Sequence, residues 1–201
     1  MADTARVAVL ISGRGSNMAA LIYAARASDC PYHVALVTGD QPAAPGLALA
    51  EAEGVPIKRL EFKKNTFFQA LHTSLCDQDI DVIALAGFMR ILPPAFLESW
   101  NGRIVNIHPS LLPRHRGLNT HRAVLAAGER LTGCTVHEVT AALDDGPILD
   151  WTEVAVLPGD TVQSLDERVR IAEHQLYPRL LAEFCTRRSL RPAIIRRSRR
   201  P

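Results

Sequence analysis

Apolar residues in the first half of the chain form short continuous runs, separated by segments with helical periodicity. The runs predict strands, because a strand buried on both faces of a parallel sheet is apolar throughout. They cover residues 6–11, 33–37, 56–60, 81–86 and 103–107. The intervening segments predict helices over 18–27, 46–53, 66–78 and 93–99. This alternation predicts an α/β fold: a doubly wound, mostly parallel twisted sheet with helices on both faces and right-handed connections.

The second half of the chain has a different pattern, which begins with a proline-rich loop from His108 to Asn119. The pattern then predicts a helix, two strands and a long amphipathic helix, over 120–127, 134–139, 148–156 and 161–184. Between the two strands, Asp144-Asp145-Gly146 is typical of a turn or short loop. We find no internal repeat or linker, so we predict a single domain over 1–201, with halves of about 1–105 and 106–186 and a short basic tail at 187–201.

Composition narrows the class of protein. With 47% hydrophobic residues the chain can bury a sizeable core, and a net charge of +2 gives no reason to expect nucleic acid as a partner. The four cysteines show no C-x-x-C pairing, which argues against a metal site or a disulfide framework. No signal peptide and no apolar stretch of about 20 residues is present, so we expect no membrane association and a cytoplasmic protein.

The loop after the first strand is a candidate phosphate site. Gly13 and Gly15 allow a tight turn and a close approach of the backbone to a ligand. Ser16 and Asn17 then open a helix, whose free amides and dipole favour an anion. An ordinary glycine-rich turn between strand and helix explains the loop equally well. The dinucleotide fingerprint is excluded, since it would need glycine where Met18 stands.

Asn106 and His108 form a second candidate site at the end of the fifth predicted strand. They are two residues apart, so their side chains point to the same side of the strand. Histidine exchanges protons near neutral pH, and a neighbouring amide can donate a hydrogen bond to a developing oxyanion. Asp144 is by itself typical of a turn, but a carboxylate near His108 would orient the imidazole.

Other polar residues have weaker claims. His137 is either a satisfied sheet histidine or part of a site wall, and His121 and Arg122 begin a predicted helix and could cap it. Glu173, on the last predicted helix, is by default part of a solvated face.

Four strings together resemble the phosphoribosylglycinamide formyltransferase family, whose members are folate-dependent enzymes of purine synthesis. The strings are Leu10-Ile-Ser-Gly-Arg-Gly-Ser-Asn17, Leu85-Ala-Gly-Phe-Met-Arg-Ile-Leu92, Asn106-Ile-His-Pro-Ser-Leu-Leu-Pro113 and Leu143-Asp-Asp-Gly-Pro-Ile148. Their order and spacing match to about Leu181. The resemblance implies the formyltransferase fold, in which the N-terminal half is Rossmann-like and holds the acceptor phosphate, and the second half is catalytic and binds folate.

The resemblance also implies the reaction and the site. The formyl group of 10-formyltetrahydrofolate would pass to the amine of phosphoribosylglycinamide, without a metal, through Asn106, His108 and Asp144. The acceptor would be held by Gly15, Ser16, Asn17, Met18, Arg170 and Glu173. Folate would be held by Lys64, Met89, Arg90, Ile91, Leu92, Asn106, Thr140, Ala141, Leu143 and Asp144. The partners implied are these small molecules, with no nucleic acid and no membrane, for a monomer or a homodimer.

The chain departs from the family in two places. Arg114-His115-Arg116-Gly117 replaces the usual basic residue, aromatic and proline before this glycine, and looks more like the corresponding loop of methionyl-tRNA formyltransferase. Asn119 stands where some members carry histidine.

Three other functions remain in view. Methionyl-tRNA formyltransferase would carry a further C-terminal domain, for which 201 residues leave no room. Formyltetrahydrofolate deformylase would carry a further N-terminal domain. A non-catalytic phosphate-binding module would explain the glycine-rich loop but not the joint presence of Asn106, His108 and Asp144.

Overall fold

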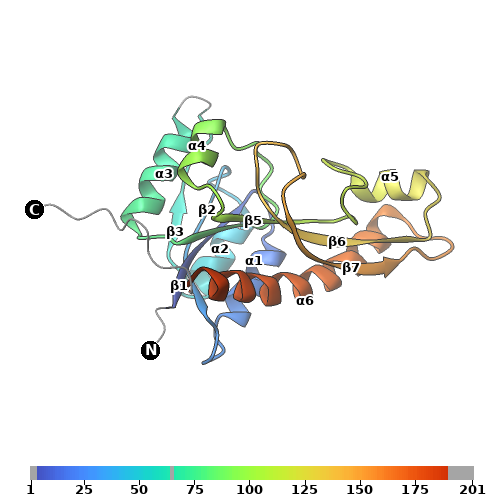
Figure 1. Ribbon diagram of the computed structural model, residues 1–201, viewed down its shortest axis with the longest axis horizontal. Helices are drawn as coiled ribbons and strands as arrows, with labels where there is room; N and C mark the ends of the chain where they lie inside the picture. The colour runs from blue at the N-terminus through green and yellow to red at the C-terminus, as the bar shows by residue number, and fades with distance from the viewer. Residues whose placement is uncertain (1–3, 64–65, 190–201) are drawn as a thin grey trace, which may run out of the picture.

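A seven-stranded sheet organises the computed structural model, which describes residues 4–63 and 66–189 (Figure 1). The strand order is β3-β2-β1-β4-β5-β6-β7. The strands are β1 (Ala5–Ile11), β2 (Tyr32–Gly39), β3 (Ile57–Arg59), β4 (Val82–Leu85), β5 (Ile104–His108), β6 (Leu131–Glu138) and β7 (Ile148–Ala155). The first five are parallel, whereas β6 and β7 run antiparallel to their neighbours. The predicted mostly parallel sheet is therefore confirmed.

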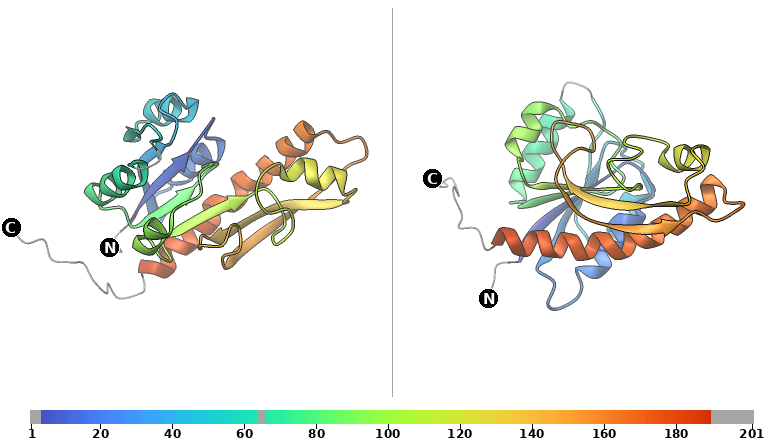
Figure 2. Two further views of the ribbon diagram at one scale, coloured as in Figure 1. Left: turned by 90° about the horizontal axis from the view of Figure 1, so that it is seen from above. Right: turned by 45° about the vertical axis from the view of Figure 1, so that its right-hand side comes forward.

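Helices cover both faces of the sheet, so the doubly wound arrangement is also confirmed (Figures 1 and 2). One face is packed by α1 (Ser16–Ala24), α2 (Pro45–Ala52), α5 (Thr120–Ala126) and α6 (Val162–Ser189). The other face is packed by α3 (Phe67–Asp77) and α4 (Pro94–Ser99). Each face thus has its own apolar cluster, which is the physical reason why the central strands are apolar throughout.

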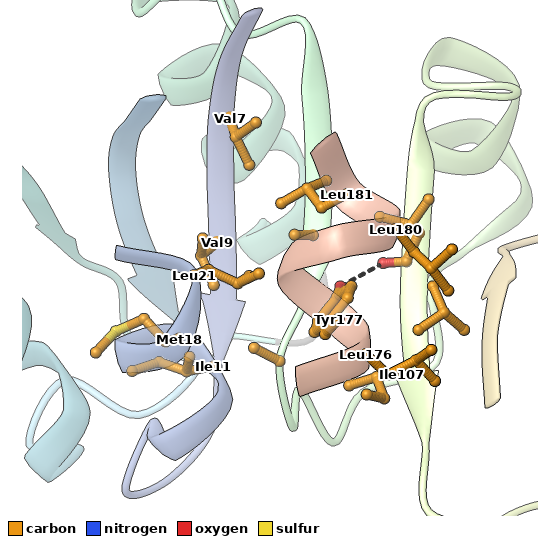
Figure 3. Close-up of a cluster of buried hydrophobic side chains, with 14 of the residues drawn as sticks. Val7, Val9, Ile11, Met18, Leu21, Ile107, Leu176, Tyr177, Leu180 and Leu181 are labelled. Atoms are coloured by element: carbon orange, nitrogen blue, oxygen red, sulfur yellow. Dashed lines mark hydrogen bonds between the residues drawn. The ribbon is translucent and has the colours of Figure 1, made fainter. Parts of the chain in front are cut away.

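The long helix α6 joins the two halves of the chain. Its buried residues Leu176, Tyr177, Leu180 and Leu181 lie between β1 and β5 (Figure 3). The Tyr177 hydroxyl lies 2.9 Å from the carbonyl oxygen of Leu85 and 3.1 Å from that of Val105, on neighbouring strands. Because α6 also packs against α1, it carries polar residues of the second half toward the loop after β1.

Two elements extend furthest beyond their predicted limits. β6 begins at Leu131 rather than at residue 134, in a stretch where Gly133 weakens the strand signal. A Cβ atom added at Gly133 would lie 1.9 Å from the carbonyl oxygen of Thr152, so glycine is required by the close pairing with β7. α6 continues past the predicted end at residue 184 to Ser189.

The strand order reverses between β1 and β4. From β1 the chain moves outward through β2 to β3, and it then returns to place β4 on the other side of β1. In open α/β sheets, ligands bind beyond the carboxyl ends of the strands at such a reversal. The loops that follow β1, β4 and β5 at this edge are therefore the expected place for a site.

Candidate active site

The loop after β1 leaves the first turn of α1 open to a ligand. Gly15 precedes the helix in the left-handed region, with φ of 74°, and no side chain caps the helix. The first turn of α1 contains no acidic residue, so its free amides and dipole favour an anion. Met18 is fully buried.

The structure brings Asn17 together with Glu173 of α6. The Asn17 Nδ2 atom donates a hydrogen bond of 2.8 Å to Oε2 of Glu173. Glu173 is 8% exposed, and burial raises the pKa of its carboxyl, an effect that the Asn17 hydrogen bond opposes. The Oδ1 atom of Asn17 is buried without a hydrogen-bond partner among the described residues. Glu173 is therefore not on a solvated helix face but in contact with the loop predicted to hold phosphate.

Asn106 lies on β5 directly opposite His137 on β6. Its Nδ2 atom is 3.2 Å from Nε2 of His137, and Nδ1 of the same ring lies 3.0 Å from the carbonyl oxygen of Glu138. Since a carbonyl only accepts, Nδ1 carries the proton and Nε2 accepts from Asn106. Burial, the largest cause, lowers the pKa of His137, which is consistent with this neutral ring. Both ring nitrogens of His137 have hydrogen-bond partners, as expected of a satisfied sheet histidine, and the ring also lies beside the candidate site.

His108, the last residue of β5, lies beside Asp144. Its Nδ1 atom is 3.4 Å from Oδ2 of Asp144, which also accepts a 2.9 Å hydrogen bond from the Gly117 amide. The other ring nitrogen, Nε2, is 2.9 Å from the carbonyl oxygen of His115. The His108 and Asp144 side chains are 7% and 9% exposed. Chain folding thus assembles Asn106, His108 and Asp144 from β5 and from the connection between β6 and β7.

Glycine allows Asp144 to reach this position. A Cβ atom added at Gly146 would lie 1.8 Å from the carbonyl oxygen of Glu138. The chain that leads into β7 therefore passes the end of β6 too closely for any side chain at this position. Asp144 has a φ of 47°, a conformation in which aspartate is enriched. The turn chemistry predicted for Asp144-Asp145-Gly146 and the placement of Asp144 beside His108 are therefore compatible.

Several of the residues predicted to line the folate pocket have exposed side chains. Met89, Ile91 and Leu143 are 62%, 79% and 58% exposed, whereas Leu92 is buried. Thr140 and Ala141 are also exposed. Lys64 lies outside the described residues.

Arg90 has a structural partner that the sequence analysis missed. Its Nε atom is 2.5 Å from Oδ2 of Asp40, whose side chain is 1% exposed. The other oxygen of Asp40 accepts a 2.6 Å hydrogen bond from the Ser12 hydroxyl, which in turn accepts one of 2.9 Å from the Met89 amide. Asp40 therefore links the loops that follow β1 and β4. The signal for Asp40 that the sequence offered was its place directly after β2, at the carboxyl edge of the sheet where ligands bind.

Three further residues have less definite places. Arg170 forms an ion pair with Asp166, one turn earlier on α6. Burial lowers the pKa of His121, with smaller contributions from Arg170 and His108, and its Nδ1 atom has no hydrogen-bond partner among the described residues. Asn119 precedes α5 with φ of 59° and makes no capping hydrogen bond through its side chain.

None of the helices in residues 4–63 and 66–189 is long and apolar enough to cross a membrane. Within the same ranges, no group of three or more His, Cys, Asp or Glu side chains is arranged to hold a metal ion.

The arrangement has the parts needed for acyl transfer. The Asn106 amide is oriented by His137 and can donate to a developing oxyanion. The ring of His108 and the carboxylate of Asp144 can hold or move a proton close by. The open N-terminus of α1 and the buried Glu173 lie at the same edge of the sheet and suit a ligand with an anionic group and polar substituents.

Comparison with known proteins agrees with this chemistry. The model of the formyl transferase family matches residues 5–181. The chain is 40% identical over 182 residues to phosphoribosylglycinamide formyltransferase of Escherichia coli (strain K12), with 89% of this chain and 86% of that protein covered. It is 46% identical over 181 residues to trifunctional purine biosynthetic protein adenosine-3 of Bos taurus, where the match covers 88% of this chain. The chain spans 18% of the length of that trifunctional protein.

A solved structure shows the same fold. The crystal structure of phosphoribosylglycinamide formyltransferase from Brucella melitensis matches with a TM-score of 0.87 at 46% sequence identity. The match covers 91% of this chain and 96% of that one.

Proposed function

The chain belongs to the formyl transferase family, and from this premise we propose that it transfers the formyl group of 10-formyltetrahydrofolate to the amine of phosphoribosylglycinamide. The products are the N-formyl amide and tetrahydrofolate, in a step of purine synthesis. The observation that carries the proposal is the convergence of Asn106, His108 and Asp144 at the sheet edge where Asn17 meets Glu173. The chain's 40% identity to the Escherichia coli enzyme supports the same choice of substrates.

The acceptor is held at the N-terminus of α1. In this proposal the backbone amides of Ser16, Asn17 and Met18 bind the phosphate, and Glu173 accepts hydrogen bonds from the ribose. Arg170 lies one turn before Glu173 on the same helix and lines the rest of the acceptor site. Holding the amine in place in this way supplies much of the rate acceleration, because the reaction between two separate molecules then becomes effectively unimolecular.

Proton movement is assigned to the three central residues. The amine's lone pair attacks the formyl carbon, and the carbonyl π pair moves onto the formyl oxygen. The Asn106 amide, and His108 when it is protonated, stabilise that oxyanion. The oxyanion then collapses, the bond from carbon to N10 of folate breaks, and N10 takes up a proton that the amine has lost. His108, or a water held by Asp144, carries that proton.

The folate is placed beside the exposed loops. Met89, Ile91 and Leu143 offer apolar surface to the pterin ring, and the salt bridge from Arg90 to Asp40 holds the loop that bears Met89 and Ile91. The chain acts as a monomer or a homodimer in the cytoplasm.

The proposal is tested by direct assay. The purified protein is mixed with 10-formyl-dideazafolate and phosphoribosylglycinamide, and the absorbance of the deformylated folate is followed. We expect the signal to require the acceptor, and mass spectrometry to find the formyl group on its amine. Folate deformylation at the same rate without acceptor would instead identify a hydrolase. No deformylation under either condition would leave the phosphate-binding module as the better explanation.

A further inference from the structure

The segment from Arg114 to Gly117 contacts both His108 and Asp144. The carbonyl oxygen of His115 lies 2.9 Å from Nε2 of His108. Two residues later, the Gly117 amide donates a 2.9 Å hydrogen bond to Oδ2 of Asp144. A shift of this segment would therefore move the partners of both side chains at once.

His115 occupies its position at a conformational cost. Its φ is 51°, in the left-handed region that residues other than glycine rarely adopt. Such a conformation persists only where surrounding contacts hold it in place. One contact comes from buried Ser110, whose hydroxyl donates to the carbonyl oxygen of Arg114 at 2.7 Å.

The side chain of His115 supplies a second contact. Its Nε2 atom lies 2.8 Å from Oε1 of Glu129, just beyond α5. The two side chains are only 18% and 23% exposed, so the contact is largely shielded from water. Arg114 reaches the same carboxylate less closely, at 3.6 Å, with a side chain that is 65% exposed.

We propose that His115, anchored by Glu129, is a positioning residue for His108. The carbonyl oxygen of His115 accepts the proton on Nε2 of His108, and this fixes which edge of the imidazole faces Asp144. If the ring turned by 180°, carbon atoms would replace both nitrogens in these contacts. With the carbonyl held, Nδ1 stays beside Asp144 and is the atom that holds or releases the transferred proton. The inference rests on the proposed function, because it assigns His108 a part in the formyl transfer.

Two variants at position 115 isolate the side-chain contact. His115→Gln retains a donor for Glu129, whereas His115→Leu has a similar size and no donor, and both place the same strain on the backbone. We expect His115→Leu to lower kcat about tenfold or more, since small misplacements of catalytic groups have effects of this order. The KM values for both substrates should stay within about twofold. His115→Gln should recover most of the lost kcat.

The partner and a control complete the set. Glu129→Leu, which leaves the strained position untouched, should lower kcat as His115→Leu does. The double variant should be no slower than either single one, because both remove the same contact. Arg114 reaches the same carboxylate from the exposed side, and the Arg114→Ala variant should keep kcat within about twofold of the parent. Melting temperatures confirm that each variant is folded.

A spectroscopic readout separates this inference from the proposed function. In the parent, ¹⁵N NMR of the His108 ring should show a hydrogen-bonded proton on Nε2, and this signature should weaken in His115→Leu. A parent that transfers no formyl group but shows this change would contradict the proposed function alone. An unchanged His108 spectrum in folded His115→Leu would overturn the inference. So would unaltered kcat in that variant, or an equal loss in His115→Gln or Arg114→Ala.

Discussion

Asn106 and His137 face each other across the antiparallel pair β5 and β6, with the amide Nδ2 3.2 Å from the imidazole Nε2. Because Nδ1 of His137 donates to the Glu138 carbonyl, Nε2 accepts, and the Asn106 amide has only one orientation that satisfies the contact. The second N–H of that amide remains for a ligand. His137 is therefore the group that determines which end of the Asn106 side chain serves as the donor.

This contact predicts a loss of stability in acid. Burial lowers the pKa of His137 from 6.5, so the folded protein takes up this proton at lower pH than the unfolded chain does. The stability that comes from the neutral ring is therefore complete above about pH 6.5 and is lost as the pH falls toward the lower folded pKa. We expect His137→Gln, which keeps an acceptor but cannot titrate, to lose less melting temperature between about pH 7 and pH 5 than the parent. Equal losses would show that the ring is not held neutral.

Loss of the central polar groups should slow the reaction more than it weakens binding. Removing one donor to an oxyanion typically lowers turnover by ~10²–10³, so we expect at least this loss in kcat for Asn106→Ala. Asp144→Asn should lose as much, because an amide cannot stabilise a protonated His108 as a carboxylate does. Acceptor binding, measured by calorimetry, should persist in both variants.

The neighbouring residue offers a matched control. Asp145 has a side chain that is 49% exposed and pairs with Arg116 at the surface. Asp145→Asn makes the same chemical change one residue away and should leave turnover close to that of the parent. Near-normal turnover in Asp144→Asn or Asn106→Ala would remove these residues from the proposed mechanism.

Much of the fold follows from local pattern. A strand buried on both faces must be apolar throughout, and each of the five parallel strands stands out between helical segments for that reason. The start of β6 was missed because Gly133 lacks a side chain, and its requirement comes from the approach of Thr152 on another strand. The position of an element's end is thus least predictable where a contact distant in sequence decides it.

The site was predictable to a smaller extent. The spacing of Asn106 and His108 puts both side chains on one side of a strand end, and this can be inferred without a structure. By contrast, Asp144 alone is a turn residue, and it was joined to them only by family resemblance. Asp40 had only its place directly after β2 as a signal, and Glu129 had none, because each acts on a residue that only folding brings near.

Asp40 should make Arg90 important for stability as well as for folate binding. Arg90→Met leaves the buried Asp40 carboxylate without its cation, so we expect the free energy of unfolding in urea to fall by about 1–3 kcal/mol. Arg90 is 36% exposed, which keeps the expected loss below that of a fully buried pair. Adding Asp40→Asn removes the unpaired charge and should restore part of the loss. If the second change destabilised the protein further, the result would show that Ser12, rather than Arg90, stabilises the charged Asp40 carboxylate.

Glu173 should show a conflict between stability and acceptor binding. Burial raises the pKa of its carboxyl above the 4.5 of an exposed glutamate, so the folded state disfavours the ionised form. Stability associated with this group is therefore greatest below about pH 4.5 and falls as the pH rises through the folded pKa. Glu173→Gln replaces the buried carboxyl with a group that cannot ionise, and its amide oxygen can still accept from Asn17. We expect its melting temperature to equal or exceed that of the parent.

The same change should weaken the proposed contact with the acceptor's ribose. Loss of the charged acceptor should raise the KM for phosphoribosylglycinamide about tenfold or more, where tenfold corresponds to ~1.4 kcal/mol. The KM for the folate should change little. Glu167→Gln, at an exposed position on the same helix, is the control and should alter neither property. A destabilised Glu173→Gln with normal acceptor KM would mean that the buried carboxylate serves only to hold Asn17, because its charge would then stabilise the fold without contacting the substrate.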